Sequence, residues 1–130
     1  MSQTKTKPVT PENMRALAEK MIDFFAKNEM WNAVNILVDG QMWQSDKSSK
    51  ATEEKTTAKG TKYYVVPDID IASHLEGSNP KTINITFEGP LYHKINYDDY
   101  DYTFKLTEKF LKPYGLYFEQ YHAWSMAAFS

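Results

Sequence analysis

Residues 82–89 restrict the fold of this chain most, because apolar and polar side chains alternate strictly along them. Ile83, Ile85 and Phe87 alternate with Asn84 and Thr86. Successive side chains of a β-strand point to opposite faces of a sheet, so this period of two predicts a strand with one buried and one polar face. The chain must therefore contain a sheet, and apolar material must cover one side of it.

A β-hairpin is predicted just upstream, where Asp39 and Gly40 separate two apolar runs. This dipeptide favours a two-residue turn because both of its positions need a positive φ. We expect strands at about 32–38 and 41–45. In that register the cross-strand pairs are Ile36 with Trp43 and Leu37 with Met42. A single strand running through Gly40 is the alternative.

The N-terminal part of the chain predicts a helix. Thr10 and Pro11 have the chemistry of an N-cap and a first-turn proline, and the helix should run from Pro11 to about Lys27, with Asn28 ending it. Its apolar positions recur at helical spacing and form one stripe: Met14, Leu17, Ala18, Met21, Ile22, Phe24 and Phe25. Residues 1–9 precede it as a polar tail.

The middle of the chain mixes polar and strand-like segments. Residues 46–61 carry lysines and acids but no side chain larger than alanine that could be buried, which predicts a mobile loop. Residues 63–66 and 69–71 have strand composition, with a bend or edge position forced by Pro67 between them. After the strand at 82–89, Gly89 and Pro90 predict a tight loop, and Leu91 and Ile95 are expected in the core.

A second helix is predicted over residues 97–112, capped by Asn96 or Asp98 and ended by Pro113 and Gly115. The acids would then lie in its first turn and lysines in its later turns, as the helix dipole favours. One face would be buried: Tyr97, Tyr100, Phe104, Thr107, Leu111 and Tyr114. An acidic, tyrosine-rich surface that imitates a nucleic acid is the alternative interpretation.

Residues 116–126 alternate again and predict a closing strand, with a break near Ala123. The order of elements indicates one α+β domain over residues 1–130. It has an N-terminal helix, an antiparallel sheet of about five to six strands and a second helix before the C-terminal strand. The helices should pack on one face of the sheet.

Composition limits the functional classes. The 130 residues contain no cysteine, which excludes disulfides and thiolate metal sites. We see no signal peptide and no run long enough to span a membrane, so a soluble, cytoplasmic protein is expected. A net charge of −2, a pI near 5.9 and scattered lysines argue against direct nucleic-acid binding. No cofactor motif is present.

Catalytic and metal-binding signals are sparse. Glu88 and His93 flank the Gly89-Pro90 turn and are the residues that could form an acid–base pair. The histidines His74, His93 and His122 are far apart in the sequence, so a metal site would need them to converge in space. Without a motif around any of these residues, the chain reads as a non-enzymatic protein.

An excess of aromatic residues indicates a binding function. Nine tyrosines and three tryptophans exceed what one small core readily buries, and such residues are favoured at interfaces. We expect a small regulatory or binding protein that contacts another protein or a second copy of itself, through a strand edge or exposed tyrosines. The residues expected at this contact are Asp98, Asp99, Asp101, Tyr92 and Tyr121.

Two other functions fit the same sequence. The first is a small-ligand or enzymatic pocket between the sheet and the N-terminal helix, with Glu88, His93 or His122 as its polar groups. The second is an acidic inhibitor that imitates nucleic acid through residues 96–101.

Overall fold

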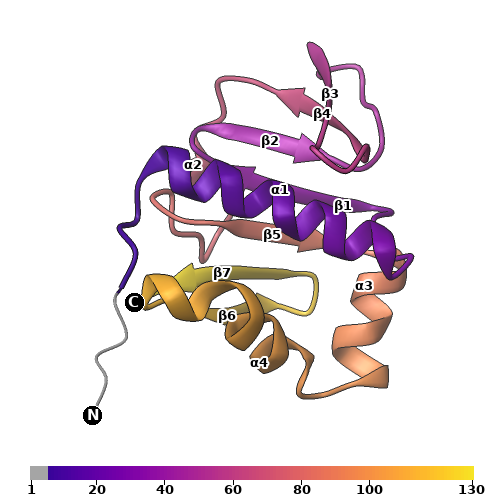
Figure 1. The fold of residues 1–130 in the computed structure, drawn as a ribbon. Helices are drawn as coiled ribbons and strands as arrows, with labels where there is room; N and C mark the ends of the chain where they lie inside the picture. The colour runs from indigo at the N-terminus through magenta and orange to yellow at the C-terminus, as the bar shows by residue number, and fades with distance from the viewer. Residues whose placement is uncertain (1–5) are drawn as a thin grey trace.

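The computed structural model describes residues 6–130 as an antiparallel sheet covered by helices (Figure 1). Its strands are β1 (Val34–Val38), β2 (Gln41–Gln44), β3 (Glu53–Thr56), β4 (Lys62–Val66), β5 (Asn84–Phe87), β6 (Tyr117–His122) and β7 (Ser125–Phe129). Its helices and helical turns are α1 (Pro11–Lys27), α2 (Ile71–His74), α3 (Gly89–His93), η1 (Lys94–Asp98), α4 (Tyr102–Leu106), η2 (Thr107–Leu111) and η3 (Lys112–Tyr114).

The seven strands form one sheet in the order β3-β4-β2-β1-β5-β7-β6, and every neighbouring pair is antiparallel. The edges of the sheet are β3 and β6. The predicted α+β fold is confirmed, although the sheet has more strands than expected. No helix within residues 6–130 has the length and apolar character needed to cross a bilayer.

Helix α1 begins and ends where the sequence predicts. The Thr10 hydroxyl oxygen accepts the Asn13 N–H at 3.1 Å, which satisfies one of the free amides of the first turn. At the other end, Asn28 Nδ2 donates to the Phe24 carbonyl at 2.8 Å. The predicted apolar stripe is buried except for Phe24, which is partly buried.

The Asp39-Gly40 hairpin is also confirmed. Both turn residues have a positive φ, 50° for Asp39 and 70° for Gly40. The pairs Ile36–Trp43 and Leu37–Met42 form in the predicted register, so the single-strand alternative is excluded. Because β1 pairs with both β2 and β5, the hairpin lies at the centre of the sheet.

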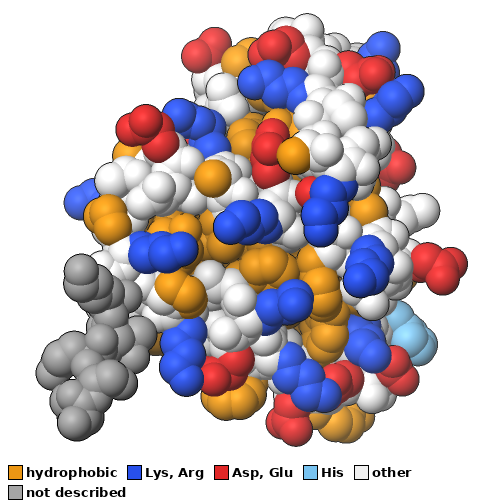
Figure 2. All heavy atoms as spheres, in the orientation of Figure 1, with side chains coloured by type: hydrophobic (Ala, Val, Ile, Leu, Met, Phe, Trp, Pro, Cys, Tyr) orange, Lys and Arg blue, Asp and Glu red, His pale blue; other side chains and the backbone are white. Residues whose placement is uncertain are grey.

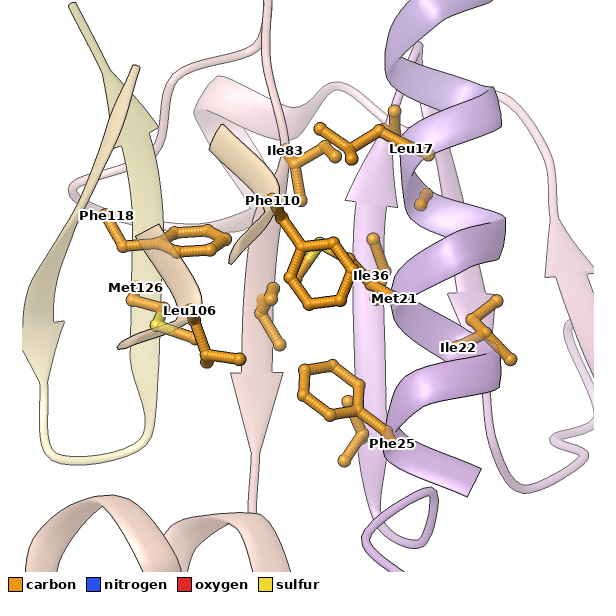
Figure 3. Packing of buried hydrophobic residues seen from close by; sticks show 14 of the residues in the cluster. Leu17, Met21, Ile22, Phe25, Ile36, Ile83, Leu106, Phe110, Phe118 and Met126 are labelled. Atoms are coloured by element: carbon orange, nitrogen blue, oxygen red, sulfur yellow. The ribbon is translucent and has the colours of Figure 1, made fainter. Parts of the chain in front are cut away.

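The main core lies between one face of the sheet and a layer made by α1 and residues 102–114 (Figure 3). Phe110 joins the two parts of that layer, since its ring meets the edge of Phe24 in α1 at a centroid distance of 5.4 Å. The space between α1 and the sheet is filled by side chains that are at most 4% exposed: Met14, Leu17, Met21, Ile22 and Phe25.

A smaller apolar cluster covers part of the opposite face, where Ile71 and Leu75 of the α2 region pack on Leu37, Met42 and Val66. The prediction of a strand at residues 69–71 is therefore wrong. The backbone leaves the sheet at Asp68, whose φ is 55°, and residues four apart then bury one side of a helical turn.

Residues 46–61 are not wholly a loop. Strand β3 lies inside this segment and pairs with β4, which follows it. All four side chains of β3 are exposed. An edge strand can form on backbone hydrogen bonds alone, so it leaves little trace in hydrophobic pattern. Thr57, directly after it, is buried, and its hydroxyl donates to the Asp23 carboxylate of α1 at 2.5 Å.

The prediction of one regular helix over residues 97–112 is wrong. The chain makes π-helical turns at η1 and η2, and at Asp99 the backbone is extended (φ −143°). Each π-turn adds a residue to the repeat, so spacings of three and four no longer mark one face. Tyr97, Tyr100 and Phe104 are exposed, and the buried residues are Tyr102, Leu106, Phe110 and Leu111.

Two further details differ at the C-terminal side. The Gly89-Pro90 loop is the short helix α3, although Leu91 and Ile95 are buried as predicted. The closing strand is two strands, β6 and β7, joined by a tight turn at residues 123–124, with a bulge between Gln120 and His122.

Candidate functional site

Large apolar side chains remain exposed mainly in the C-terminal part of the chain. Within residues 6–130 this group, which we term the aromatic surface, comprises Tyr97, Tyr100, Phe104, Tyr117, Tyr121 and Trp124. Tyr100 is 82% exposed and Phe104 is 65% exposed. Contiguous exposed apolar patches mark interaction sites on proteins, and aromatic residues are enriched at interfaces.

A hollow of about 490 Å³ is lined by Glu88, Gly89, Tyr92 and Trp124, the last of which belongs to the aromatic surface. Three elements meet there. Glu88 follows β5, Tyr92 lies on α3, and Trp124 lies in the turn between β6 and β7, which Figure 1 shows beside α3.

Hydrogen bonds from backbone amides and from one side-chain amide fix the walls of this hollow. The Phe87 N–H donates to the Trp124 carbonyl at 2.8 Å, and the Glu88 N–H donates to the Ala33 carbonyl at 2.9 Å. Asn96 Nδ2 donates both to the Tyr92 carbonyl at 3.0 Å and to the Ala123 carbonyl at 2.8 Å. The helical wall and the turn are therefore held together by one amide group.

Further rings adjoin the hollow. The His122 imidazole stacks on the Trp124 indole at 4.2 Å with 12° between the ring planes. Tyr121 meets His122 edge-on at 4.7 Å, and Tyr97 lies 6.2 Å from Tyr92. The arrangement offers an aromatic contact area whose rings already touch one another. Their side chains therefore lose little conformational entropy when a partner binds.

The structure separates the predicted acid–base pair. Glu88 lines the hollow beside Trp124, while His93 lines a different one with Lys94 and Tyr102. No hydrogen bond or ion pair joins Glu88 to His93 in the part of the chain that the structure describes.

The histidines do not converge either. His74 lies with Glu88 and Trp124 around a neighbouring hollow of about 290 Å³, and His122 Nε2 is 3.8 Å from a Glu76 carboxylate oxygen. His93 packs against Tyr97 instead. Among the residues described, no group of three or more histidine, aspartate or glutamate side chains is placed to hold a metal ion.

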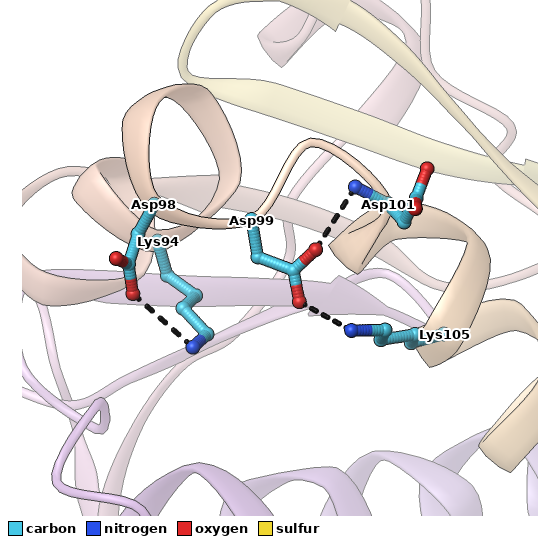
Figure 4. Close-up of polar contacts among 5 residues, drawn as sticks. All are labelled: Lys94, Asp98, Asp99, Asp101 and Lys105. Carbon is cyan, nitrogen blue, oxygen red and sulfur yellow. Dashed lines mark hydrogen bonds and ion pairs between the residues drawn. The ribbon is translucent and has the colours of Figure 1, made fainter.

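The acidic segment is paired with lysines (Figure 4). Asp98 lies 3.2 Å from Lys94 Nζ and Asp99 lies 2.7 Å from Lys105 Nζ. The hydrogen bond from Lys105 lowers the pKa of Asp99, and the same bond raises the pKa of Lys105. The Asp99 carboxylate also accepts the Asp101 N–H at 3.1 Å. Asp99 therefore stabilises the non-helical connection between η1 and α4.

A separate groove of about 720 Å³ crosses α1 on the face shown in Figure 2, where blue lysines surround orange hydrophobic surface. Its basic residues are Lys20, Lys27, Lys59 and Lys109. The Lys109 ammonium lies 4.9 Å from the centre of the Phe24 ring, and Phe110 is buried. The groove can attract anions, and the Lys109 ammonium already lies over the partly buried Phe24 ring.

Sequence reasoning placed Glu88, Tyr92 and Tyr121 among the site residues but missed Trp124. The available signal was the break in the alternation expected near Ala123, which places Trp124 in a connection between strands, where binding residues commonly lie. Comparison of the chain with protein-family models, with curated proteins and with solved structures gives no match.

Proposed function

We propose that this chain is a small non-enzymatic binding protein that contacts another protein through its aromatic surface. The observation that carries the proposal is the gathering of exposed tyrosine, phenylalanine and tryptophan rings between residues 97 and 124. Leaving such rings in water forgoes the free energy of burying them, about 25 cal/mol per Å² of apolar area, which a partner would recover.

Side-chain contact has more support than strand addition. β6 is an edge strand and could in principle pair with a partner's strand. However, the Phe118 N–H on its outer edge already donates to the Thr107 hydroxyl oxygen at 2.9 Å. The rings of Tyr117 and Tyr121 on the same strand are 44% and 55% exposed, so a partner can contact them.

The two other functions have less support. A pocket between the sheet and α1 would need space that Met21, Ile22 and Phe25 fill completely. Imitation of nucleic acid would need a row of free carboxylates, whereas Asp98 and Asp99 are each paired with a lysine.

Capture experiments with purified protein test the proposal. Wild-type protein and the variant Tyr100→Ser/Phe104→Ser are used as baits in the host lysate, and each captured protein is identified, purified and titrated back. We expect the variant to bind at least about tenfold more weakly, since truncation of central aromatic residues costs about 2 kcal/mol or more at interfaces.

The matched control is Lys47→Ser/Lys50→Ser, which changes two exposed residues of the β2–β3 connection. It should bind like wild type. Size-exclusion chromatography with light scattering shows whether the partner is a second copy. A strict monomer that captures nothing, or equal binding by both variants, would contradict the proposal.

A further inference from the structure

We propose that the hollow lined by Glu88, Tyr92 and Trp124 binds a cationic side chain, the guanidinium or ammonium group of an arginine or lysine presented by a partner polypeptide. This inference rests on the proposed function and names the chemistry that the partner brings. It is carried by three observations: a carboxylate that pairs with no group in residues 6–130, two aromatic walls and a framework that holds them apart.

The carboxylate of Glu88 is available. Glu88 stands at the N-cap position of α3, but its side chain does not bond to the amides of that helix. It forms no ion pair within residues 6–130 and is exposed. Among the described residues, none of the others that line this hollow is basic, and His74 lines the neighbouring hollow that shares Glu88 and Trp124. The charge at this position therefore favours a cation and opposes an anion.

The aromatic walls suit the same ligand. Trp124 is 43% exposed, and the Tyr92 ring is partly exposed. Indole and phenol faces carry negative potential, and they attract guanidinium and ammonium groups within about 6 Å. An apolar ligand would gain from the rings but would desolvate the Glu88 carboxylate without compensating it. The combination of rings and carboxylate thus selects a cation that also has an apolar stem.

The framework keeps the hollow open. Asn96 holds the Tyr92 wall and the Ala123 turn through a single amide, and Gln120 Nε2 donates to Asn96 Oδ1 at 3.2 Å. His122 stacks on the indole and restricts its rotation. Because these groups are fixed before binding, the side chains of the hollow lose little conformational entropy when a cation enters.

The test uses the full chain and a defined probe, an acetylated and amidated glycine-arginine-glycine peptide. The matched probe replaces arginine with citrulline, which keeps the shape and removes the charge. Binding is followed by amide and indole NMR shifts and by tryptophan fluorescence. We expect the arginine peptide to bind about threefold or more tightly than the citrulline peptide, as exposed cation–π and ion-pair contacts allow. Its largest shifts should include the Trp124 indole N–H.

Variants separate the contributions. Glu88→Gln should weaken arginine binding by about threefold and reduce its salt dependence, and Trp124→Leu should weaken it similarly. Glu119→Gln changes an exposed carboxylate of β6 that does not line the hollow and should bind like wild type. Thermal unfolding of each variant confirms that it is folded before it is titrated.

Several outcomes overturn the inference: equal binding of the two peptides, an unchanged affinity in Glu88→Gln, no binding of the arginine peptide, or shifts that map away from the hollow. Tighter binding of free choline than of the peptide would assign the hollow to a small ammonium ligand and also reject it. If a captured partner depends on Tyr100 and Phe104 but not on Glu88, the proposed function stands and this inference fails. If arginine binds at the hollow but no partner is captured, the proposed function fails.

Discussion

The ring of Tyr121 lies against the backbone of Gly77, so closely that a β-carbon added to Gly77 would be 2.3 Å from Tyr121 Cγ. This contact joins the connection after α2 to the end of β6, at the bulge where Tyr121 is the extra residue. Gly77 also has a φ of 78°, which is unfavourable for any residue that has a β-carbon. Two constraints therefore act on one glycine.

Gly77→Ala should destabilise the protein by about 2 kcal/mol, because it adds a steric clash to an unfavourable φ. Urea unfolding measures the loss. In Gly77→Ala/Tyr121→Ser the clash is removed, so about half of the loss should return, while the part due to φ persists. Equal stabilities of wild type and Gly77→Ala would show that the contact does not form.

Asn84 should be more important for stability than its position on a polar stripe implies. It is fully buried, its Nδ2 donates to the carbonyls of Leu37 and Asn79, and its Oδ1 accepts the Asn79 N–H at 2.7 Å. Asn84→Ala removes three hydrogen bonds and takes away the side chain that accepts the Asn79 N–H, so it should cost about 3 kcal/mol. Chemical denaturation gives this value directly.

The control for that variant is Asn35→Ala, on the neighbouring strand. Asn35 Nδ2 donates to the Thr86 hydroxyl at 3.1 Å in a partly exposed position, where water can replace it. Its loss should cost less than about 1 kcal/mol. Similar losses for the two variants would mean that burial of Asn84 does not matter.

Stability should fall in alkali because of Tyr102. Burial raises its pKa to about 12, and the negative charge of Asp99 adds to the effect. A phenol with a folded pKa above its unfolded value of 10.0 contributes stability that is complete below pH 10 and is lost as the pH rises through about 12. Burial and the hydrogen bond to Glu19 raise the pKa of Tyr63 too, so both residues act in this range.

Tyr102→Phe isolates one contribution. Between about pH 9 and about pH 12, the free energy of unfolding of wild type should fall by about 2 kcal/mol more than that of the variant. Parallel losses over this range would show that Tyr102 ionises as freely in the folded protein as in the unfolded chain.

Asp99 should make the stability of the protein depend on pH in the acidic range. Its hydrogen bond from Lys105 lowers its pKa, so its contribution is present above the unfolded value of 3.8 and is lost as the pH falls through the lower folded value. Asp99→Asn should therefore be less stable than wild type at neutral pH and equal to it in strong acid. Asp101→Asn, a neighbouring carboxylate outside the ion pairs described for residues 6–130, is the control and should track wild type.

The local signals explain which elements were predictable. Thr10, Pro11 and Asn28 fix the ends of α1 through hydrogen bonds made within a few residues, and Asp39-Gly40 fixes a turn by its φ preference. Such features depend on neighbours in the chain, so they can be read without knowledge of the rest. The exposed strand β3 was missed because its pairing with β4 uses backbone groups that every residue carries.

The candidate site was harder to predict, since it is made of parts from distant segments. The Gly-Pro turn between Glu88 and Tyr92 indicates a candidate site at these residues, but no sequence pattern near them connects them to Trp124. That connection depends on the hydrogen bonds of Asn96 and Phe87 across three elements.

By itself, the sequence determined the class of fold, the first helix and the central hairpin, because period, caps and turn residues are local properties of the chain. Only the tertiary structure decided which rings after Asn96 point to water. There the extended backbone at Asp99 and the π-helical turns on either side rotate the side chains away from regular helical spacing. Packing of Phe110 and Leu111 in the core stabilises that irregular path, and it leaves Tyr97, Tyr100 and Phe104 on the surface.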